Sequence, residues 1–181
     1  VISSGCKESE VFELLETIKP VRGRMELAAT RRNGASVYVD YAHTPEAIEV
    51  ALKSLKPHIL GKLIVIIGAG GERDEGKRPL MGLAAEKNSD FVIITDDNPR
   101  NEDPQLIHQM IKNGIKDKNK VMVIGDRAEA ILKAVDLLGV GDCLLIAGKG
   151  HETEQFIGEN IFPFDDFEQA SLSVSSLDGI E

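Results

Sequence analysis

Residues 95–100 combine two carboxylates, an amide, a rigid proline and one arginine, which together could bind a charged small molecule. They follow the apolar run Phe91–Ile94, which is typical of a buried strand, and precede Asp103-Pro104, which is typical of a helix start. In open α/β sheets, ligands bind at loops that follow the carboxyl ends of strands. Because an arginine can hold a carboxylate through two parallel hydrogen bonds and an aspartate can hold an ammonium group, this loop favours an amino acid over a phosphate. The alternative is a capped turn whose charges are solvated.

Two further stretches place glycines beside charged residues after an apolar run. The stretch 68–78 contains Arg73, but its glycines fit neither the G-x-x-x-x-G-K-[ST] phosphate loop nor the G-x-G-x-x-G dinucleotide pattern. The stretch 148–152 reads G-K-G-H-E, and its glycines would allow the backbone to approach a ligand closely. The alternative interpretation is a pair of flexible turns, with Lys149 as a surface lysine and His151 as a loop histidine.

A fourth stretch, residues 40–45, reads D-Y-A-H-T-P and links a strand-like alternating run to a helix start. Its Asp40 could accept hydrogen bonds from both vicinal hydroxyls of a ribose. The alternative for His43 is a loop histidine bonded to local backbone. The G-R-M-E stretch at 23–26 is weaker evidence, because Arg24 could equally be a solvated hinge residue.

These stretches together resemble the Mur ligase family, in the branch that adds meso-diaminopimelate. D-N-P-R at 97–100, G-G-x-R-D-x-G-K-R-P-L-M at 70–81 and G-K-G-H-E at 148–152 are similar to motifs of that branch. D-Y-A-H-x-P at 40–45 and G-R-x-E at 23–26 are similar to motifs of the family as a whole. The resemblance covers nearly the whole chain, from about Gly23 onward.

The resemblance implies an ATP-dependent ligase of peptidoglycan synthesis, in which ATP activates the D-glutamyl carboxylate of UDP-MurNAc-L-Ala-D-Glu as an acyl phosphate. The amine of meso-diaminopimelate then attacks that acyl phosphate. ATP and Mg²⁺ would be bound mainly by a central domain whose motifs are not in this sequence. The implied substrate-binding residues are Arg73, Asp97, Asn98, Pro99, Arg100, Gly148 and Glu152. The implied nucleotide-binding residues are Arg24, Asp40 and His43, and neither a metal ligand nor a catalytic residue is expected in this chain.

The order of apolar runs, charged loops and amphipathic helices predicts an α/β fold. We expect a Rossmann-like three-layer domain, with a mostly parallel sheet of about six strands and helices on both faces. The loops after parallel strands would then meet at one edge of the sheet. Their two arginines and two acids could match the two carboxylates and two ammonium groups of meso-diaminopimelate, or another charged amino acid. Residues 156–167 resemble the closing hairpin of the family, and residues 171–181 suggest a helix end or a disordered tail.

Composition and charge exclude several classes of function. The chain has 181 residues and a net charge of −9, which argues against non-specific binding to nucleic acid or to an anionic membrane surface. No apolar run approaches the roughly 20 residues of a membrane span, and no signal-peptide pattern is present. Cys6 and Cys143 have neither metal-site nor redox spacing. A cytoplasmic location is therefore expected.

Residues 1–22 differ in composition from the rest of the chain. Residues 9–18 predict one amphipathic helix, closed by Pro20. We expect 1–22 to be the tail and linker of a preceding ATP-binding central domain, and 23–181 to be a Mur ligase C-terminal domain that is inactive alone. The alternative is a stand-alone binding module for a charged amino acid. Sister ligases that act on cyanophycin, folylpolyglutamate or D-Ala-D-Ala rank lower, because they share the D-Y-A-H-type turn but not D-N-P-R with G-K-G-H-E.

Overall fold

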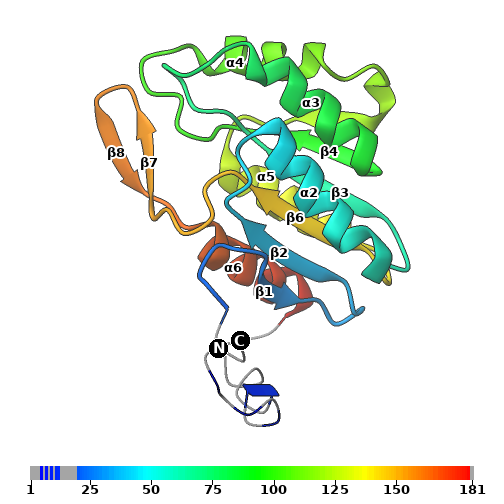
Figure 1. Ribbon diagram of the computed structural model, residues 1–181. Helices are drawn as coiled ribbons and strands as arrows, with labels where there is room; N and C mark the ends of the chain where they lie inside the picture. The colour runs from blue at the N-terminus through cyan, green and yellow to red at the C-terminus, as the bar shows by residue number, and fades with distance from the viewer. Residues whose placement is uncertain (1–4, 6, 8, 10, 13–19, 180–181) are drawn as a thin grey trace.

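The computed structural model describes residues 5, 7, 9, 11–12 and 20–179. The helix expected over residues 9–18 lies mostly outside the described residues. A six-stranded sheet forms the centre of the molecule, in the order β1-β2-β6-β3-β4-β5 (Figure 1). Its strands are β1 (Glu26–Thr30), β2 (Ser36–Asp40), β3 (Leu63–Ile67), β4 (Phe91–Ile94), β5 (Val121–Val123) and β6 (Cys143–Ala147).

All strand pairs in this sheet are parallel except β1 with β2. The central strands β3 and β6 are buried at every position, because helices cover both of their faces. Their continuous apolar sequences were the clearest strand signals, and the expected mostly parallel sheet is confirmed. The antiparallel strand β1 was not expected, because its sequence Glu-Leu-Ala-Ala-Thr lacks the alternation of polar and apolar residues.

Helices cover the sheet in two layers. One layer contains α2 (Pro45–Leu55), α3 (Lys77–Asn88) and α4 (Pro104–Asn113), and the other contains α5 (Arg127–Asp136) and α6 (Asp166–Asp178). The first layer buries residues such as Ile48 and Ile107 against one face of the sheet. The second layer buries Ile131 and Ala170 against the other face. This arrangement confirms the three-layer α/β prediction.

The helix ends follow the local sequence signals closely. Thr44, Asp103 and Asp126 each accept a backbone hydrogen bond at the N-cap of α2, α4 and α5. Gly114 follows α4, as expected. Helix α3 begins at Lys77, two residues before the proline that suggested its start. Short 3-10 turns at Lys56–His58 and Lys118–Lys120 complete the connections.

A two-stranded hairpin lies outside the main sheet. Strands β7 (Glu154–Ile157) and β8 (Asn160–Pro163) form their own two-stranded sheet and extend from one side of the body (Figure 1). The hairpin overlaps the stretch 156–167 that resembled the closing hairpin of the family, but it begins two residues earlier and ends at Pro163. Of the predicted stretch 171–181, residues up to Asp178 belong to helix α6, as the helix-end alternative expected, and residues 180–181 lie outside the described residues.

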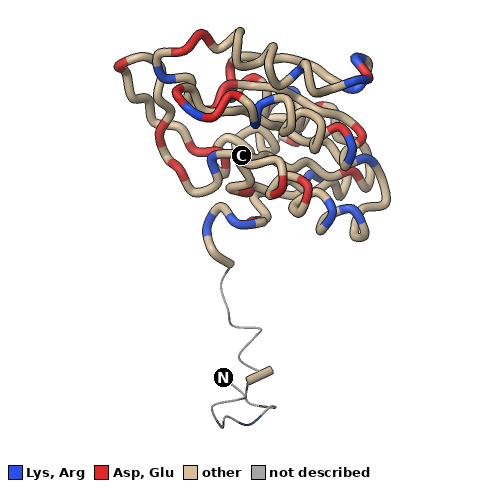
Figure 2. The backbone as a smooth tube through the Cα atoms, turned by 45° about the horizontal axis from the view of Figure 1, so that its top comes forward, with Lys and Arg blue, Asp and Glu red and all other residues tan. Residues whose placement is uncertain are grey.

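Charged residues of both signs are spread over the body (Figure 2). Among the described residues, no helix is long and apolar enough to cross a membrane.

Candidate functional site: the loops after four neighbouring strands

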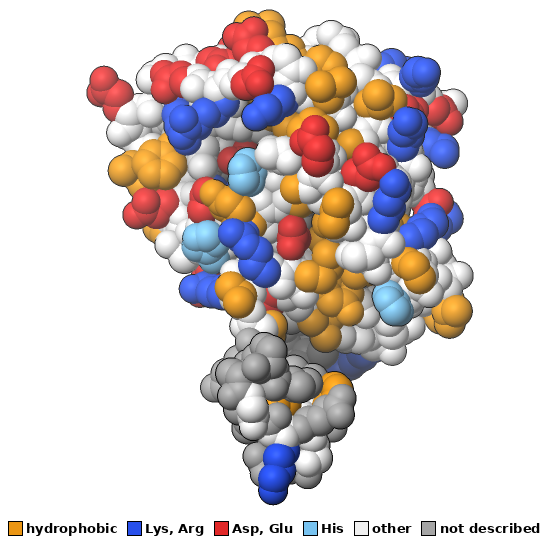
Figure 3. Space-filling view, in the orientation of Figure 1, with side chains coloured by type: hydrophobic (Ala, Val, Ile, Leu, Met, Phe, Trp, Pro, Cys, Tyr) orange, Lys and Arg blue, Asp and Glu red, His pale blue; other side chains and the backbone are white. Residues whose placement is uncertain are grey.

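A cavity of about 430 Å³ opens where the loops after β2, β6, β3 and β4 meet. These four strands are adjacent and parallel, so the loops after their carboxyl ends gather on one edge, as predicted. Basic, acidic and histidine side chains are interspersed on the face shown in Figure 3. Seven of the predicted site residues line the cavity: His43, Arg73, Asp97, Asn98, Arg100, Gly148 and Glu152.

Asp97 is the buried acid of this cavity. Burial raises its pKa above the usual range, although the charges of Arg127 and Lys149 oppose the rise. Gly148 lies directly against it with φ of +121°, and a Cβ at Gly148 would stand 2.6 Å from Asp97 Oδ2. Any larger residue at Gly148 would therefore press on the Asp97 carboxylate.

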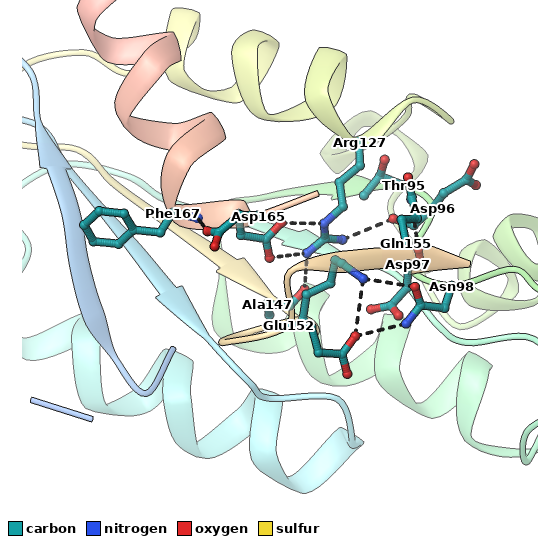
Figure 4. Close-up of polar contacts among 12 residues, drawn as sticks. Thr95, Asp96, Asp97, Asn98, Arg127, Ala147, Glu152, Gln155, Asp165 and Phe167 are labelled. Atoms are coloured by element: carbon teal, nitrogen blue, oxygen red, sulfur yellow. Dashed lines mark hydrogen bonds and ion pairs between the residues drawn. The ribbon is translucent and has the colours of Figure 1, made fainter. Parts of the chain in front are cut away.

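Asn98 and Glu152 are joined by a lysine that the sequence pattern suggested as a surface residue. That interpretation of Lys149 is wrong, because its exposed fraction is 0%. Its Nζ donates to Asn98 Oδ1 at 3.0 Å and to Glu152 Oε2 at 3.3 Å. Asn98 Nδ2 donates to the same Glu152 oxygen at 3.0 Å, so the two side chains point toward each other (Figure 4).

This network leaves part of Glu152 available to a ligand. Both hydrogen bonds to its carboxylate use Oε2, and Oε1 accepts none from the described residues. The Glu152 side chain keeps 33% of its surface exposed. The carboxylate is thus held at one oxygen and free to accept from an ammonium group at the other.

Arg100 has an unusual backbone and a guanidinium directed at a neighbouring loop. Its φ is +52°, a left-handed conformation that is uncommon for a residue other than glycine. Its Nη1 donates to Gly71 O at 2.8 Å and to Asn98 O at 3.4 Å. Its Nη2 and Nε make no hydrogen bond within the described chain, so they remain available to a carboxylate.

Arg73 and Pro99 occupy different positions relative to the cavity. Arg73 is exposed on the cavity wall and makes no hydrogen bond or ion pair to the described residues. Pro99 is buried and does not line the cavity. Its carbonyl packs against Gly71, where a Cβ would stand 1.9 Å from Pro99 O. Pro99 therefore shapes the loop rather than facing the ligand space.

The three predicted nucleotide-binding residues gather around Tyr41. The Arg24 guanidinium lies 4.2 Å from the Tyr41 ring centroid. His43 Nδ1 lies 2.8 Å from Tyr41 O, which is the local backbone contact given as its alternative. Asp40 accepts from the backbone nitrogens of Met25 and Ala42 at 2.7 and 2.8 Å, one on each carboxylate oxygen. Of the three, His43 lines the cavity, whereas Arg24 and Asp40 do not.

The segment that precedes β1 contacts the 148–152 loop directly. A Cβ at Gly23 would stand 2.2 Å from both Gly150 C and His151 N, so only two bare backbones fit there. The His151 ring also lies 5.2 Å from the Tyr41 ring.

Two buried arginines hold together the elements and loops that form the cavity. Arg127 donates two 2.7 Å hydrogen bonds to Asp166, and it also donates to Asp96 O and Ala147 O (Figure 4). It thereby ties the ends of β4 and β6 to α6, which is a structural role. Although burial opposes its charge, the Asp166 carboxylate raises the pKa of Arg127.

The second buried arginine, Arg78, had no signal in the sequence that marked it as buried. It is 1% exposed, and its Nη1 and Nη2 contact the two Glu102 oxygens at 2.8 and 3.0 Å. Its Nη2 also donates to Gly70 O, and Glu102 accepts from Glu72 N. Arg78 and Glu102 therefore fasten the glycine loop after β3 to the loop after β4.

Metal ligands do not cluster in this region. Within the described residues, no group of three or more His, Cys, Asp or Glu side chains is placed to hold a metal ion.

Comparison with known proteins decides the family. The family model for "Mur ligase, glutamate ligase domain" matches residues 23–150. This chain belongs to that family. The Mur ligase domain of Coxiella burnetii UDP-N-acetylmuramoyl-L-alanyl-D-glutamate–2,6-diaminopimelate ligase is 50% identical over 160 residues, or 88% of this chain and 32% of that protein. The Bradyrhizobium diazoefficiens ligase of the same name is 47% identical over 97% of this chain and 35% of its own length.

Solved structures agree with the family assignment. A structure of a ligase with the same name matches this Mur ligase domain with a TM-score of 0.82 at 37% identity, covering 97% of this chain and 36% of that chain. The MurC ligase of Thermotoga maritima matches with a TM-score of 0.66 at 18% identity, which shows the fold alone. The chain spans about a third of the length of the curated relatives it matches.

Proposed function

We propose that this chain is the C-terminal, amino-acid-binding and lid domain of an ATP-dependent ligase that adds meso-diaminopimelate to UDP-MurNAc-L-Ala-D-Glu. The observation that carries the proposal is one cavity whose charged lining leaves two arginines, Arg73 and Arg100, and two acids, Asp97 and Glu152, for a ligand. The other charged lining residues are paired within the chain, Lys77 with Asp74 and Arg78 with Glu102. Meso-diaminopimelate has two carboxylates and two ammonium groups, so each charge of the ligand has an opposite charge in the cavity. The names of the similar ligases support the same substrate.

The free hydrogen-bonding atoms indicate what each side chain does. Arg100 offers Nη2 and Nε, and Arg73 offers its whole guanidinium, so these residues hold carboxylates. Glu152 Oε1 and the Asp97 carboxylate accept from ammonium groups. Asn98 has its Oδ1 occupied by Lys149 and Phe156 N, so it presents only N–H to a ligand.

In the intact ligase, meaning this chain within the longer protein, ATP would phosphorylate the D-glutamyl γ-carboxylate to an acyl phosphate. A neutral amine of meso-diaminopimelate would attack the acyl carbon, form the amide bond and release phosphate. The contribution of this chain is to hold the amino acid with that amine toward the acceptor. Binding several charges of a small molecule at once removes much of its orientational freedom before the reaction.

Arg24, Asp40 and His43 would contact the nucleotide when this domain closes over it. Asp40 fits this role, because a carboxylate has about four acceptor sites and the backbone occupies two of them. His43 lies on the cavity wall, between the amino-acid residues and the Tyr41 cluster. ATP and Mg²⁺ would be bound mainly by the central domain.

The proposed organisation follows from this role. Residues 1–22 are the tail and linker of the central domain, and residues 23–181 are the Mur ligase C-terminal domain. The isolated chain has no ligase activity, and the intact ligase acts in the cytoplasm on cell-wall precursors. The alternative function is a stand-alone module that binds a charged amino acid, which the same cavity would serve.

The first test is an amide NMR titration of this chain with meso-diaminopimelate and, separately, with L-lysine, which lacks the second carboxylate. We expect meso-diaminopimelate to shift the amides of Arg73, residues 97–100 and residues 148–152 more strongly than L-lysine does. Equal shifts with both ligands would contradict selectivity for diaminopimelate. Ligase turnover by the isolated chain would contradict the domain proposal.

A second experiment separates ligase from binding module. The intact ligase should form an amide from meso-diaminopimelate, ATP and UDP-MurNAc-L-Ala-D-Glu, with one ATP consumed for each amide. Tight binding of diaminopimelate without any ATP-dependent turnover would favour the binding module instead.

A further inference from the structure

The β7–β8 hairpin makes four hydrogen bonds to the loop that contains Asp97, Asn98 and Arg100. Gln155 Nε2 donates to Asp97 O at 2.9 Å, and Phe156 N donates to Asn98 Oδ1 at 3.1 Å. Arg100 N donates to Phe156 O at 3.0 Å, and Gly158 N donates to Arg100 O at 2.7 Å. The hairpin therefore contacts three of the residues assigned to the amino-acid pocket without lining the pocket itself.

Arg100 is joined to the hairpin as a one-residue parallel strand, bridged to Ile157. Both backbone polar groups of Arg100 are used in this bridge. A left-handed backbone at an arginine is unfavourable by itself and persists where its surroundings hold it. The bridge to the hairpin stabilises this conformation. It also fixes the backbone from which the Arg100 guanidinium reaches Gly71 O.

Gln155 is the buried contact between the hairpin and the loop. It is 8% exposed, while its neighbour Glu154 on the same strand is exposed. Figure 4 shows Gln155 beside Asp97, close to the Asn98–Glu152 pair. A hydrogen bond to a buried carbonyl is costly to lose, because the carbonyl then has neither a protein partner nor water.

The tip of the hairpin is set by Gly158. Its φ is +58°, and the strands on either side are separated by only two residues, which is typical of a hairpin turn that needs glycine at its first position. No atom lies within 4 Å of a Cβ built at Gly158, so the constraint at this position is the backbone conformation and not space.

We propose that the β7–β8 hairpin is a positioning element for the amino-acid pocket, and that Gln155 is its principal positioning residue. This inference rests on the proposed amino-acid-binding function. The hairpin holds the 97–100 loop in its binding conformation before the ligand arrives, so binding does not have to order that loop. Residues of the hairpin thereby determine affinity for the amino acid without contacting it.

The principal test compares Gln155→Met with Glu154→Gln in the intact ligase. Methionine keeps the length of the side chain but removes the donor to Asp97 O, and Glu154→Gln alters the exposed neighbour on the same strand. We expect Gln155→Met to raise the KM for meso-diaminopimelate about three- to tenfold, which is the effect of losing one buried hydrogen bond. The KM for ATP should stay unchanged, and Glu154→Gln should leave both values unchanged.

A second pair of variants tests the same proposal from the hairpin tip. Gly158→Val places a β-branched residue at a positive φ, whereas Gly158→Asn places a residue that tolerates it. Both keep the N–H that donates to Arg100 O. The valine variant should reproduce the KM effect of Gln155→Met, and the asparagine variant should not. This pair also decides the matter if Gln155→Met fails to fold.

Hydrogen exchange of the ligand-free chain gives a readout that is independent of the proposed activity. The Arg100 and Gly158 amides should be protected in wild type and exchange several-fold faster in Gln155→Met and Gly158→Val. If Gln155→Met and Gly158→Val keep the wild-type KM for meso-diaminopimelate and the wild-type protection of these amides, the positioning role is overturned. A parallel rise in the KM for ATP would indicate general loosening and would also overturn it. Wild-type ligase that does not use diaminopimelate would refute the proposed function, with the exchange result still deciding whether the hairpin orders the loop.

Discussion

At the scale of single residues, the buried carboxyl group of Asp97 lowers the stability of the fold but suits the proposed binding of an ammonium group. Because burial raises its pKa, the folded state holds the Asp97 proton more tightly than the unfolded chain does. Ionisation therefore lowers stability as the pH rises from the unfolded pKa through the folded pKa. A buried carboxylate costs stability unless a partner such as a bound ammonium group offsets its burial.

Asp97→Asn should accordingly raise the melting temperature of the chain at pH 7 and leave it nearly unchanged below about pH 4, where both forms are neutral. The same variant should weaken meso-diaminopimelate binding by about tenfold or more, because an amide does not carry the charge. Thermal unfolding at several pH values and calorimetric titration would measure both effects. Asp136→Asn, at an exposed position, is the control, and a lower melting temperature for Asp97→Asn would contradict the argument.

Arg100→Ala should cost roughly 2–5 kcal/mol of amino-acid affinity in the intact ligase, because it removes a charge from the cavity and leaves the ligand carboxylate unpaired. ATP affinity should change little. The measurement is the Kd of each substrate for wild type, Arg100→Ala and the exposed-loop control Arg32→Ala. Equal losses for both substrates would mean that the variant disturbs the fold or that the assigned role is wrong.

At the scale of elements, α3 and the loop after β4 depend on the Arg78–Glu102 pair. The hydrogen bond from Arg78 lowers the pKa of Glu102 below its usual value of 4.5. The stability from this carboxylate is therefore fully present above that usual value and is lost as the pH falls through the folded pKa. Glu102→Gln should lower the melting temperature at pH 7, and the difference from wild type should vanish in acid.

The comparison for this prediction is Glu159→Gln, at the exposed hairpin tip. Amide NMR of the chain should also show larger changes at Gly70, Gly71 and Glu72 for Glu102→Gln than for the control, because their loop is fastened by this pair. A melting-temperature difference that persists unchanged at about pH 3, below the usual pKa of a glutamate, would show that the Glu102 charge is not the cause.

The elements that the sequence revealed are those with strong local signals. Strands β3 and β6 are continuous apolar runs, and three helices begin directly after the side chains that cap them, Thr44, Asp103 and Asp126. Strand β1 was missed, because it lies at the sheet edge with an irregular register and a partly exposed sequence. Edge strands carry a weak pattern, and tertiary pairing decides them.

The prediction of the candidate site was likewise partial, because it also missed residues whose contacts are distant in sequence. The residues that face the cavity lie in motifs, so Arg73, Asp97, Arg100 and Glu152 could be named from the sequence. The residues that hold them in place could not. Lys149 meets Asn98 across 51 positions of sequence, and Gln155 meets Asp97 across 58. A contact of that separation has no local signal, and a lysine in a loop or a glutamine in a hairpin strand is usually exposed.

At the scale of the whole molecule, one buried thiol can report on cooperative unfolding. Cys143 begins the central strand β6, and burial raises its pKa to about 12. Only the thiolate reacts, so Cys143 should resist alkylation at about pH 8 until the sheet opens. Mass spectrometry of peptides would follow Cys143 apart from Cys6, and the rate of labelling should rise with urea as global unfolding does. Rapid labelling of Cys143 in native buffer would contradict this expectation.

The contact between Gly23 and Gly150 has a mechanical consequence. Two bare backbones meet there with no side chain to absorb a displacement, and Gly150 lies in the same short loop as Lys149 and Glu152. Arg22, just ahead of Gly23, pairs with Asp165 at the start of α6, so the segment before β1 contacts both α6 and the loop that holds Glu152. A displacement of residues 22–23 relative to the sheet would therefore move the 148–152 loop as well.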